Sequence, residues 1–213
     1  VGSSSTTEAI ELVETSLKNG INKCLAVTPY YNKPSQKGLE LHFTELSKIG
    51  AEIILYNVPG RTGVDLLPST IEKLIEIKTI SGIKEAVNAQ ERFLALRKIK
   101  EKRQDFKLYS GDDPSYVEFM KFKGDGVISV AANVMPREMK ELSNLCLAGN
   151  FIEAEKKIKN YQEIFKLLFT ESSPSPCKFI LEKLLLLENN LRLPLHPLSE
   201  EYREKIYEAF KNI

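Results

Sequence analysis

The sequence has few of the residues that mark disulfide-rich, metal-binding or redox proteins. It contains no tryptophan, two histidines and three cysteines. Cys24, Cys146 and Cys177 lie far apart in the sequence and form no Cys-x-x-Cys pair. This pattern argues against a disulfide framework and against a structural zinc site. We therefore expect a protein without a bound metal that works in a reducing compartment, the cytoplasm.

The sequence also lacks long apolar runs and an excess of one charge. No stretch approaches the ~18 uninterrupted apolar residues that suggest a transmembrane helix, and no signal peptide is visible. The 30 basic and 29 acidic residues give a net charge of +1, and no basic stripe is interleaved with aromatic residues. We therefore expect neither a membrane nor a nucleic acid as partner.

What the sequence does contain is a regular alternation of strand and helix patterns. The chain has 213 residues, of which 42% are hydrophobic, enough for one large domain or two small ones. Apolar runs typical of buried strands are found at 23–31, 51–59, 80–86, 106–111 and 125–133. Segments with helical spacing occupy 6–20, 37–50, 67–77, 89–103, 113–123 and 136–150. This alternation predicts a parallel sheet covered by helices, an α/β fold.

Beyond residue 150 the alternation ends, and three helical segments follow at about 151–170, 176–188 and 199–212. We therefore expect an α/β portion over 1–150 and a helical domain over 151–213. Five parallel strands suit an open doubly wound sheet or part of a (β/α)8 TIM barrel, and the lack of a G-x-G-x-x-G or Walker segment favours the barrel. A complete barrel needs about 250 residues. The sequence thus corresponds to the last five βα units, and we expect the earlier strands to precede it.

A lysine stands at the end of the third predicted strand, "ISGIKEA" (80–86). Lys84 shares a strand face with Gly82, whereas Glu85 points to the opposite face and is badly placed to pair with the lysine. Burial lowers the pKa of a lysine, and a neutral amine can attack a carbonyl carbon. Gly82 is expected to leave room for a substrate. Lys84 is therefore a candidate Schiff-base nucleophile, and the alternative is a lysine paired with an acid.

Tyrosines and an arginine follow the first two predicted strands, at the edge where parallel α/β sheets carry their chemistry. Tyr30 and Tyr31 end the first strand, Tyr56 ends the second, and Arg61 lies in the next turn, "NVPGRTG". A tyrosine hydroxyl can relay a proton, and an arginine can bind a carboxylate through two hydrogen bonds. Rim tyrosines and a surface ion pair are the open alternatives.

The paired aspartates of "SGDDP" (110–114) could be mistaken for a metal site. Because Pro114 and a helical pattern follow them, we expect Asp112 and Asp113 to cap a helix.

Five segments of this sequence together resemble one known family. "TPYYNKPSQKGL", "ILYNVPGRTG", "GIKEA", "SGDD" and "GVISVAANVMP" occur in the order and spacing of the 4-hydroxy-tetrahydrodipicolinate synthases, long called dihydrodipicolinate synthases. The resemblance covers essentially the whole chain. It implies a (β/α)8 barrel with a C-terminal helical domain, assembled as a homotetramer of tight dimers. It also implies a lyase that condenses pyruvate with aspartate semialdehyde in lysine and diaminopimelate biosynthesis.

The resemblance assigns roles to five residues. It implies that Lys84 forms the Schiff base with pyruvate, so that no cofactor beyond this covalent adduct is needed. Tyr56 would relay protons, and Tyr31 would cross the dimer interface to join the neighbouring subunit's relay. Arg61 would bind the carboxylate of the semialdehyde. The backbone near Ile128 would line the pyruvate site.

The match is incomplete at the N-terminal side and in one regulatory feature. Family members carry a G-T-T-G-E-type segment with a relay threonine, and this sequence has none. Inhibition by lysine at the dimer interface is common in the family, and Glu8 and Tyr30 match that site, with Ser4 in place of an asparagine. Two alternatives stay open: a related keto-acid aldolase such as N-acetylneuraminate lyase, and an inactive truncated member of the family.

Overall fold

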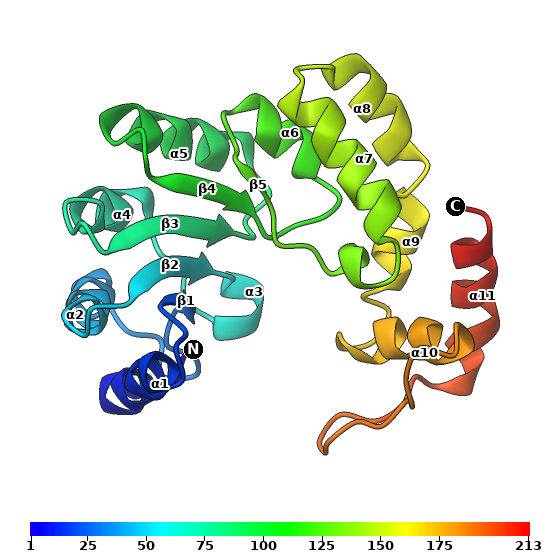
Figure 1. Ribbon diagram of the computed structural model, residues 1–213, viewed down its shortest axis with the longest axis horizontal. Helices are drawn as coiled ribbons and strands as arrows, with labels where there is room; N and C mark the ends of the chain where they lie inside the picture. Colours follow the sequence, from blue (N-terminus) through cyan, green and yellow to red (C-terminus); the bar gives the residue numbers. More distant parts are fainter. The chain divides into compact units, whose positions relative to one another are not determined.

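The computed structural model describes the whole chain, residues 1–213. The chain forms two compact units (Figure 1). The first consists of Val1–Asp112 with Phe122–Ile128 and contains all of the strands. The second consists of Asp113–Lys121 with Ser129–Ile213 and is helical. The division that we expected at residue 150 stays a prediction.

The first unit is built around five parallel strands whose order in the sheet is their order in the sequence. They are β1 (Lys23–Val27), β2 (Glu52–Asn57), β3 (Ile80–Glu85), β4 (Lys107–Ser110) and β5 (Gly126–Val127). Each strand therefore pairs with the next one along the chain, and all five carboxyl ends lie at one edge of the sheet. This edge is the place where barrel enzymes carry their functional residues.

Four helices alternate with these strands: α1 (Thr6–Lys18), α2 (Gln36–Ser47), α4 (Pro68–Leu74) and α5 (Gln90–Lys102). Each packs against the next, in a single row beside the sheet (Figure 1). Right-handed crossovers that always advance to the neighbouring strand place every helix on the same face. A doubly wound sheet would carry helices on both faces. The structure therefore has the winding of a barrel, and it excludes the doubly wound alternative.

The core of this unit lies between the sheet and the helix row. Ala26, Ile53, Leu55 and Ile83 project from alternate strand positions and are fully buried. They face apolar side chains of the helices, of which Leu39, Phe43, Ile71, Phe93 and Leu96 are all at most 2% exposed. Full burial of such a side chain stabilises the fold by about 1.5–3 kcal/mol. Because these residues point toward the helices, the residues that alternate with them point to the other face of the sheet. Lys84 lies on that other face.

The second unit contains η1 (Ala131–Asn133) and six helices. The helices are α6 (Tyr116–Lys121), α7 (Pro136–Leu147), α8 (Phe151–Lys159), α9 (Gln162–Leu167), α10 (Ser175–Lys183) and α11 (Glu200–Lys211). Within it α6, α7 and α8 pack on one another, and α11 packs on α9 and α10. No helix of the chain combines the length and the apolar character needed to cross a membrane.

One predicted strand is wrong in most of its length. Of the run 125–133, only Gly126–Val127 is strand, and Ala131–Asn133 is a 3-10 turn. The carboxylate of Asp113 accepts hydrogen bonds from the backbone N–H groups of Val130 (3.0 Å) and Ala131 (2.9 Å). Asp113 thus caps this turn, which ends the strand despite its apolar sequence.

Candidate active site

Lys84 lies in the middle of a row of side chains at the carboxyl edge of the sheet. In the strand register Tyr56 of β2 is opposite Lys84 of β3, and Lys84 is opposite Tyr109 of β4. Laterally paired residues of parallel strands point to the same face. Lys84 is 9% exposed, and its Nζ atom is 4.3 Å from the centre of the Tyr56 ring. The structure therefore brings the predicted nucleophile and the predicted proton relay together.

Gly111 provides the space that the Lys84 side chain occupies. A Cβ atom at Gly111 would lie 3.0 Å from Cε and 3.2 Å from Cγ of Lys84. The Gly111 N–H also donates to the carbonyl of Glu85 at 2.7 Å, which holds the loop after β4 against the end of β3. The sequence analysis missed this role, although a glycine directly after a strand is a signal of close backbone approach.

The role that we expected for Gly82 is wrong. A Cβ atom at Gly82 would be 2.7 Å from the carbonyl oxygen of Lys107 and 3.0 Å from its Cβ. Gly82 therefore allows β4 to pack closely on β3, and it does not leave space for a substrate.

Arg61 is exposed and acts electrostatically on Tyr56. Burial raises the pKa of the Tyr56 hydroxyl, and the charge of Arg61 partly opposes this increase. Arg61 belongs to the short helix α3 (Pro59–Thr62), which follows β2 directly. Pro59 begins this helix and Gly63, with φ 76°, ends it, as expected for these residue types. A cation is thus held beside the phenol at the edge of the site.

Tyr31 does not join Lys84 within one chain. Its side chain is 92% exposed, and its backbone adopts a left-handed conformation with φ 73°. Such a conformation costs about 1–3 kcal/mol for a residue other than glycine, and residues that bear this cost cluster at functional sites. The Tyr31 N–H donates to the carbonyl of Thr62 at 3.4 Å, which ties this loop to α3.

Ile128 follows β5 at the same edge of the sheet. Its N–H donates to the carbonyl of Ser110 at 2.9 Å, and Ser110 is opposite Glu85 in the register. The backbone at Ile128 therefore lies two strands away from β3, beside the end of β4.

The residues of the expected lysine site come from the loop before α1, from the first turn of α1 and from the loop after β1. The side chain of Asn32 donates to the carbonyl of Ser4 at 2.8 Å, so that Ser4 lies beside the loop that carries Tyr30. Glu8 accepts a hydrogen bond from Ser3. Both Ser4 and Glu8 are exposed, and the ring of Tyr30 is partly exposed.

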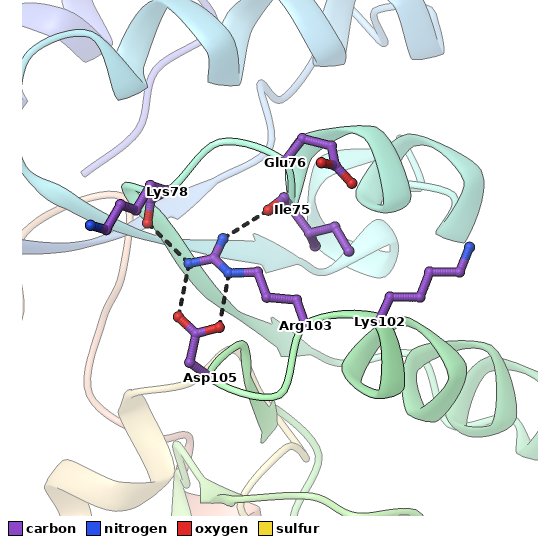
Figure 2. Close-up of a pocket in the computed structure, with 6 residues that line it drawn as sticks. All are labelled: Ile75, Glu76, Lys78, Lys102, Arg103 and Asp105. Atoms are coloured by element: carbon purple, nitrogen blue, oxygen red, sulfur yellow. Dashed lines mark hydrogen bonds and ion pairs between the residues drawn. The ribbon is translucent and has the colours of Figure 1, made fainter.

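A hollow of about 290 Å³ lies at the opposite edge of the sheet, and its residues have a structural role, so it is not a candidate site (Figure 2). Arg103 lines it and donates to the carbonyls of Ile75 (2.8 Å), Ile77 (3.1 Å), Lys78 (3.0 Å) and Ile80 (2.8 Å). Asp105 accepts two further hydrogen bonds from the same guanidinium, which leaves no N–H free for a ligand.

Sequential parallel strands, a single row of helices and a buried lysine at the carboxyl edge define a barrel protein of the TIM type. A sequence profile of the dihydrodipicolinate synthetase family matches residues 1–213. The chain belongs to this family. Both the resemblance and the fold class that we expected are confirmed.

Individual relatives agree with this assignment. The 4-hydroxy-tetrahydrodipicolinate synthase of Stutzerimonas stutzeri is 44% identical over 212 residues, which are 99% of this chain and 72% of that protein. The dihydrodipicolinate synthase of Thermotoga maritima has a similar structure, with a TM-score of 0.95 and 39% identity over 99% of this chain and 72% of that chain. The chloride-inhibited enzyme of Acinetobacter baumannii, solved with pyruvate, has a TM-score of 0.93 and 40% identity over the same shares.

Proposed function

We propose that this chain is a lyase that condenses pyruvate with L-aspartate 4-semialdehyde to 4-hydroxy-tetrahydrodipicolinate, in lysine and diaminopimelate biosynthesis. One observation carries the proposal: the buried amine of Lys84 lies 4.3 Å from the centre of the Tyr56 ring, and the positive charge of Arg61 acts on the hydroxyl of that tyrosine. The name of the Stutzerimonas relative and the pyruvate in the Acinetobacter complex support the same reaction. The enzyme acts in the cytoplasm.

The chemistry begins at Lys84. Its amine attacks the carbonyl carbon of pyruvate, and loss of water leaves an iminium ion. The iminium nitrogen withdraws electrons, so that the methyl carbon loses a proton and an enamine forms. The enamine carbon attacks the aldehyde of the second substrate, whose oxygen takes up a proton. The amine of that substrate then attacks the iminium carbon and displaces Lys84, which closes the product ring. The iminium nitrogen is the electron sink, so this route uses no metal or organic cofactor.

The other side chains position the substrates and move protons. Tyr56 transfers protons during formation of the iminium ion and of the new bond, because its phenol ring lies against the Lys84 amine. Arg61 binds the carboxylate of the semialdehyde as a planar, permanently charged donor. The backbone at Ile128 binds pyruvate at the end of β5.

The active form is a homotetramer built from tight dimers. Tyr31 crosses from one subunit to the proton relay of its neighbour. The exposed ring of Tyr31 supports this role, since tyrosine is enriched at protein interfaces. Ser4 and Glu8, at the start of α1, and Tyr30, in the adjacent loop after β1, form a site for the inhibitor lysine, with the Glu8 carboxylate as partner for its ammonium group.

Turnover of pyruvate with aspartate semialdehyde by the purified protein tests the proposal. Wild-type protein is expected to consume both substrates, and Arg61→Ala to raise the KM for the semialdehyde about 10- to 100-fold, since it removes a charged hydrogen bond. Arg97→Ala, which removes an exposed arginine of α5, is the control and is expected to match wild type. Cleavage of N-acetylneuraminate in place of the condensation would assign the chain to that aldolase, and no turnover of either substrate would identify an inactive member.

A further inference from the structure

Four polar side chains, three of them buried, form a cluster on the helix side of the sheet, directly behind the active-site row. They are Asn57 of β2, Glu85 of β3, Arg92 of α5 and Asp65 of the loop between α3 and α4. Asn57 is fully buried, Glu85 is 1% exposed and Arg92 is 8% exposed. Asn57 and Glu85 directly follow Tyr56 and Lys84 in the sequence. A charge at this depth needs a specific set of partners.

Glu85 is the centre of this cluster. Its carboxylate accepts hydrogen bonds from the side-chain amide of Asn57 at 3.0 and 3.2 Å and from the backbone N–H of Val87 at 2.8 Å. The guanidinium of Arg92 lies 3.4 Å from the same carboxylate. Donors from β2, from α5 and from the loop after β3 therefore all meet at one acceptor.

The cluster also holds the loop that follows the helix of Arg61. Arg92 donates to the carbonyl of Leu66 at 2.8 Å and forms an ion pair with Asp65. The amide of Asn57 donates to Asp65 at 2.7 Å, and its oxygen accepts from the N–H of Leu66 at 2.9 Å. One network thus joins the three segments that carry Tyr56, Arg61 and Lys84.

The network is sensitive to the charge of Glu85. Two carboxylates share one guanidinium, and the groups that face Glu85 are Arg92 of α5, Asp65 of the α3–α4 loop and the neutral amide of Asn57. Burial raises the pKa of Glu85 to about 7, and Asp65 contributes to the increase, while Arg92, Val87 and Asn57 oppose it. Protonation puts an O–H donor on a carboxyl that already faces three donors, and it weakens the carboxyl as an acceptor. Protonation would therefore loosen the junction between β2 and β3.

We propose that Glu85 is a positioning residue for the reaction: through Asn57 and Arg92 its carboxylate holds Tyr56 and Lys84 in their reactive arrangement. This proposal rests on the proposed function. Because the chemical step depends on the placement of the hydroxyl relative to the amine, a small displacement changes kcat more than the KM for pyruvate.

Glu85→Gln tests the proposal because glutamine has the same shape but no charge. Turnover is measured per site, by counting the sites that trap pyruvate with borohydride. At about pH 8, kcat of the variant is expected to be about tenfold lower than that of wild type, with the KM for pyruvate within about twofold. Below about pH 6, where Glu85 of the wild type is itself protonated, the difference is expected to become small. The control is Glu52→Gln, which removes the surface partner of Lys23 and is expected to match wild type.

A second variant keeps the proposal testable if Glu85→Gln does not fold. Asp65→Asn removes the neighbouring charge that raises the pKa of Glu85, so the rise of kcat near pH 7 is expected to shift to lower pH. Three results would each overturn the positioning role. One is an equal kcat for Glu85→Gln and wild type, and another is a decrease in the kcat of Glu85→Gln that stays constant across pH. The third is a pH profile of kcat that does not shift in Asp65→Asn. Wild-type protein that traps no pyruvate would instead overturn the proposed function.

Discussion

The Nζ atom of Lys84 lies over the face of the Tyr56 ring, 4.3 Å from its centre, and the two residues are opposite each other on neighbouring strands. This arrangement follows from the register of β2 and β3, which brings both residues to the same face at the same height. A protonated lysine over an aromatic ring gains about 0.5–2 kcal/mol. The contact also keeps the Tyr56 ring next to the amine to which pyruvate would become attached.

Tyr56→Phe separates the ring from the hydroxyl. The variant keeps the surface against which Lys84 packs but cannot relay a proton, so we expect kcat to fall about 100-fold or more while borohydride still traps pyruvate. Tyr109→Phe is the matched control, since Tyr109 is the register partner of Lys84 on the other side, in β4. Steady-state kinetics check the prediction. Equal losses in the two variants would show that the Tyr56 hydroxyl has no special role.

Gly111→Ala is expected to displace the nucleophile. The added methyl group would be 3.0 Å from Cε of Lys84 and 3.2 Å from the carbonyl oxygen of Glu85, closer than ordinary van der Waals contact. We expect the rate of pyruvate trapping to fall about tenfold or more. At Gly126 the same substitution meets the ring of Tyr109 at an ordinary distance of 3.6 Å, so Gly126→Ala is the control. Unchanged trapping in Gly111→Ala would mean that the lysine can move aside without cost.

Arg103→Met is expected to destabilise the fold without affecting the chemistry. The substitution removes the donor that joins the carbonyls of Ile75 and Lys78 (Figure 2), and the carbonyl of Ile80 loses the same donor. We expect the free energy of unfolding to decrease by about 2–4 kcal/mol, and turnover per folded protein to stay as in wild type. Denaturant unfolding measures the change. Arg97→Met, at a partly exposed residue of α5, is expected to change stability by about 0.5 kcal/mol or less. An equal effect of the two substitutions on stability would contradict a stabilising role for the hydrogen bonds of Arg103.

His42 makes stability depend on pH. It is 3% exposed, Thr6 contacts its Nδ1 atom at 2.9 Å, and its Nε2 atom is buried without a partner. Burial lowers the pKa of His42 to about 4. In the unfolded chain the histidine takes up a proton below about pH 6.5, so stability present above that pH is lost as the pH falls toward 4, by roughly 3 kcal/mol in all.

Unfolding curves at a series of pH values test this dependence. Because glutamine does not titrate, this part of the loss of stability at acid pH is expected to disappear in His42→Gln. His196→Gln, at the exposed second histidine, is expected to retain it. An acid profile of His42→Gln identical to that of wild type would contradict the prediction.

The positions at the strand ends could be predicted because the alternation of strand faces and the parallel order of the sheet are local consequences of the sequence. Lys84 and Tyr56 fall at equivalent positions of adjacent strands, which the register confirms. The buried strands and the helices between them follow from apolar spacing for the same reason.

What could not be predicted depends on contacts between residues far apart in the sequence. The end of β5 is set by Asp113, whose carboxylate takes the two backbone donors that a continued strand would have used. The crowding that requires Gly82 comes from Lys107, on the next strand. The partner of Glu85 in β2, Asn57, is likewise 28 residues away. No local pattern carries this information.

Intact mass measurement after incubation with pyruvate and borohydride tests the central assignment most directly. We expect one reduced pyruvate adduct per chain, located by peptide mapping on Lys84, and no adduct in Lys84→Met. The Met side chain keeps the length and apolar contacts of the lysine but has no amine. Wild-type protein that gains no adduct, or an adduct that maps to another lysine, would contradict the assignment of Lys84 as the nucleophile.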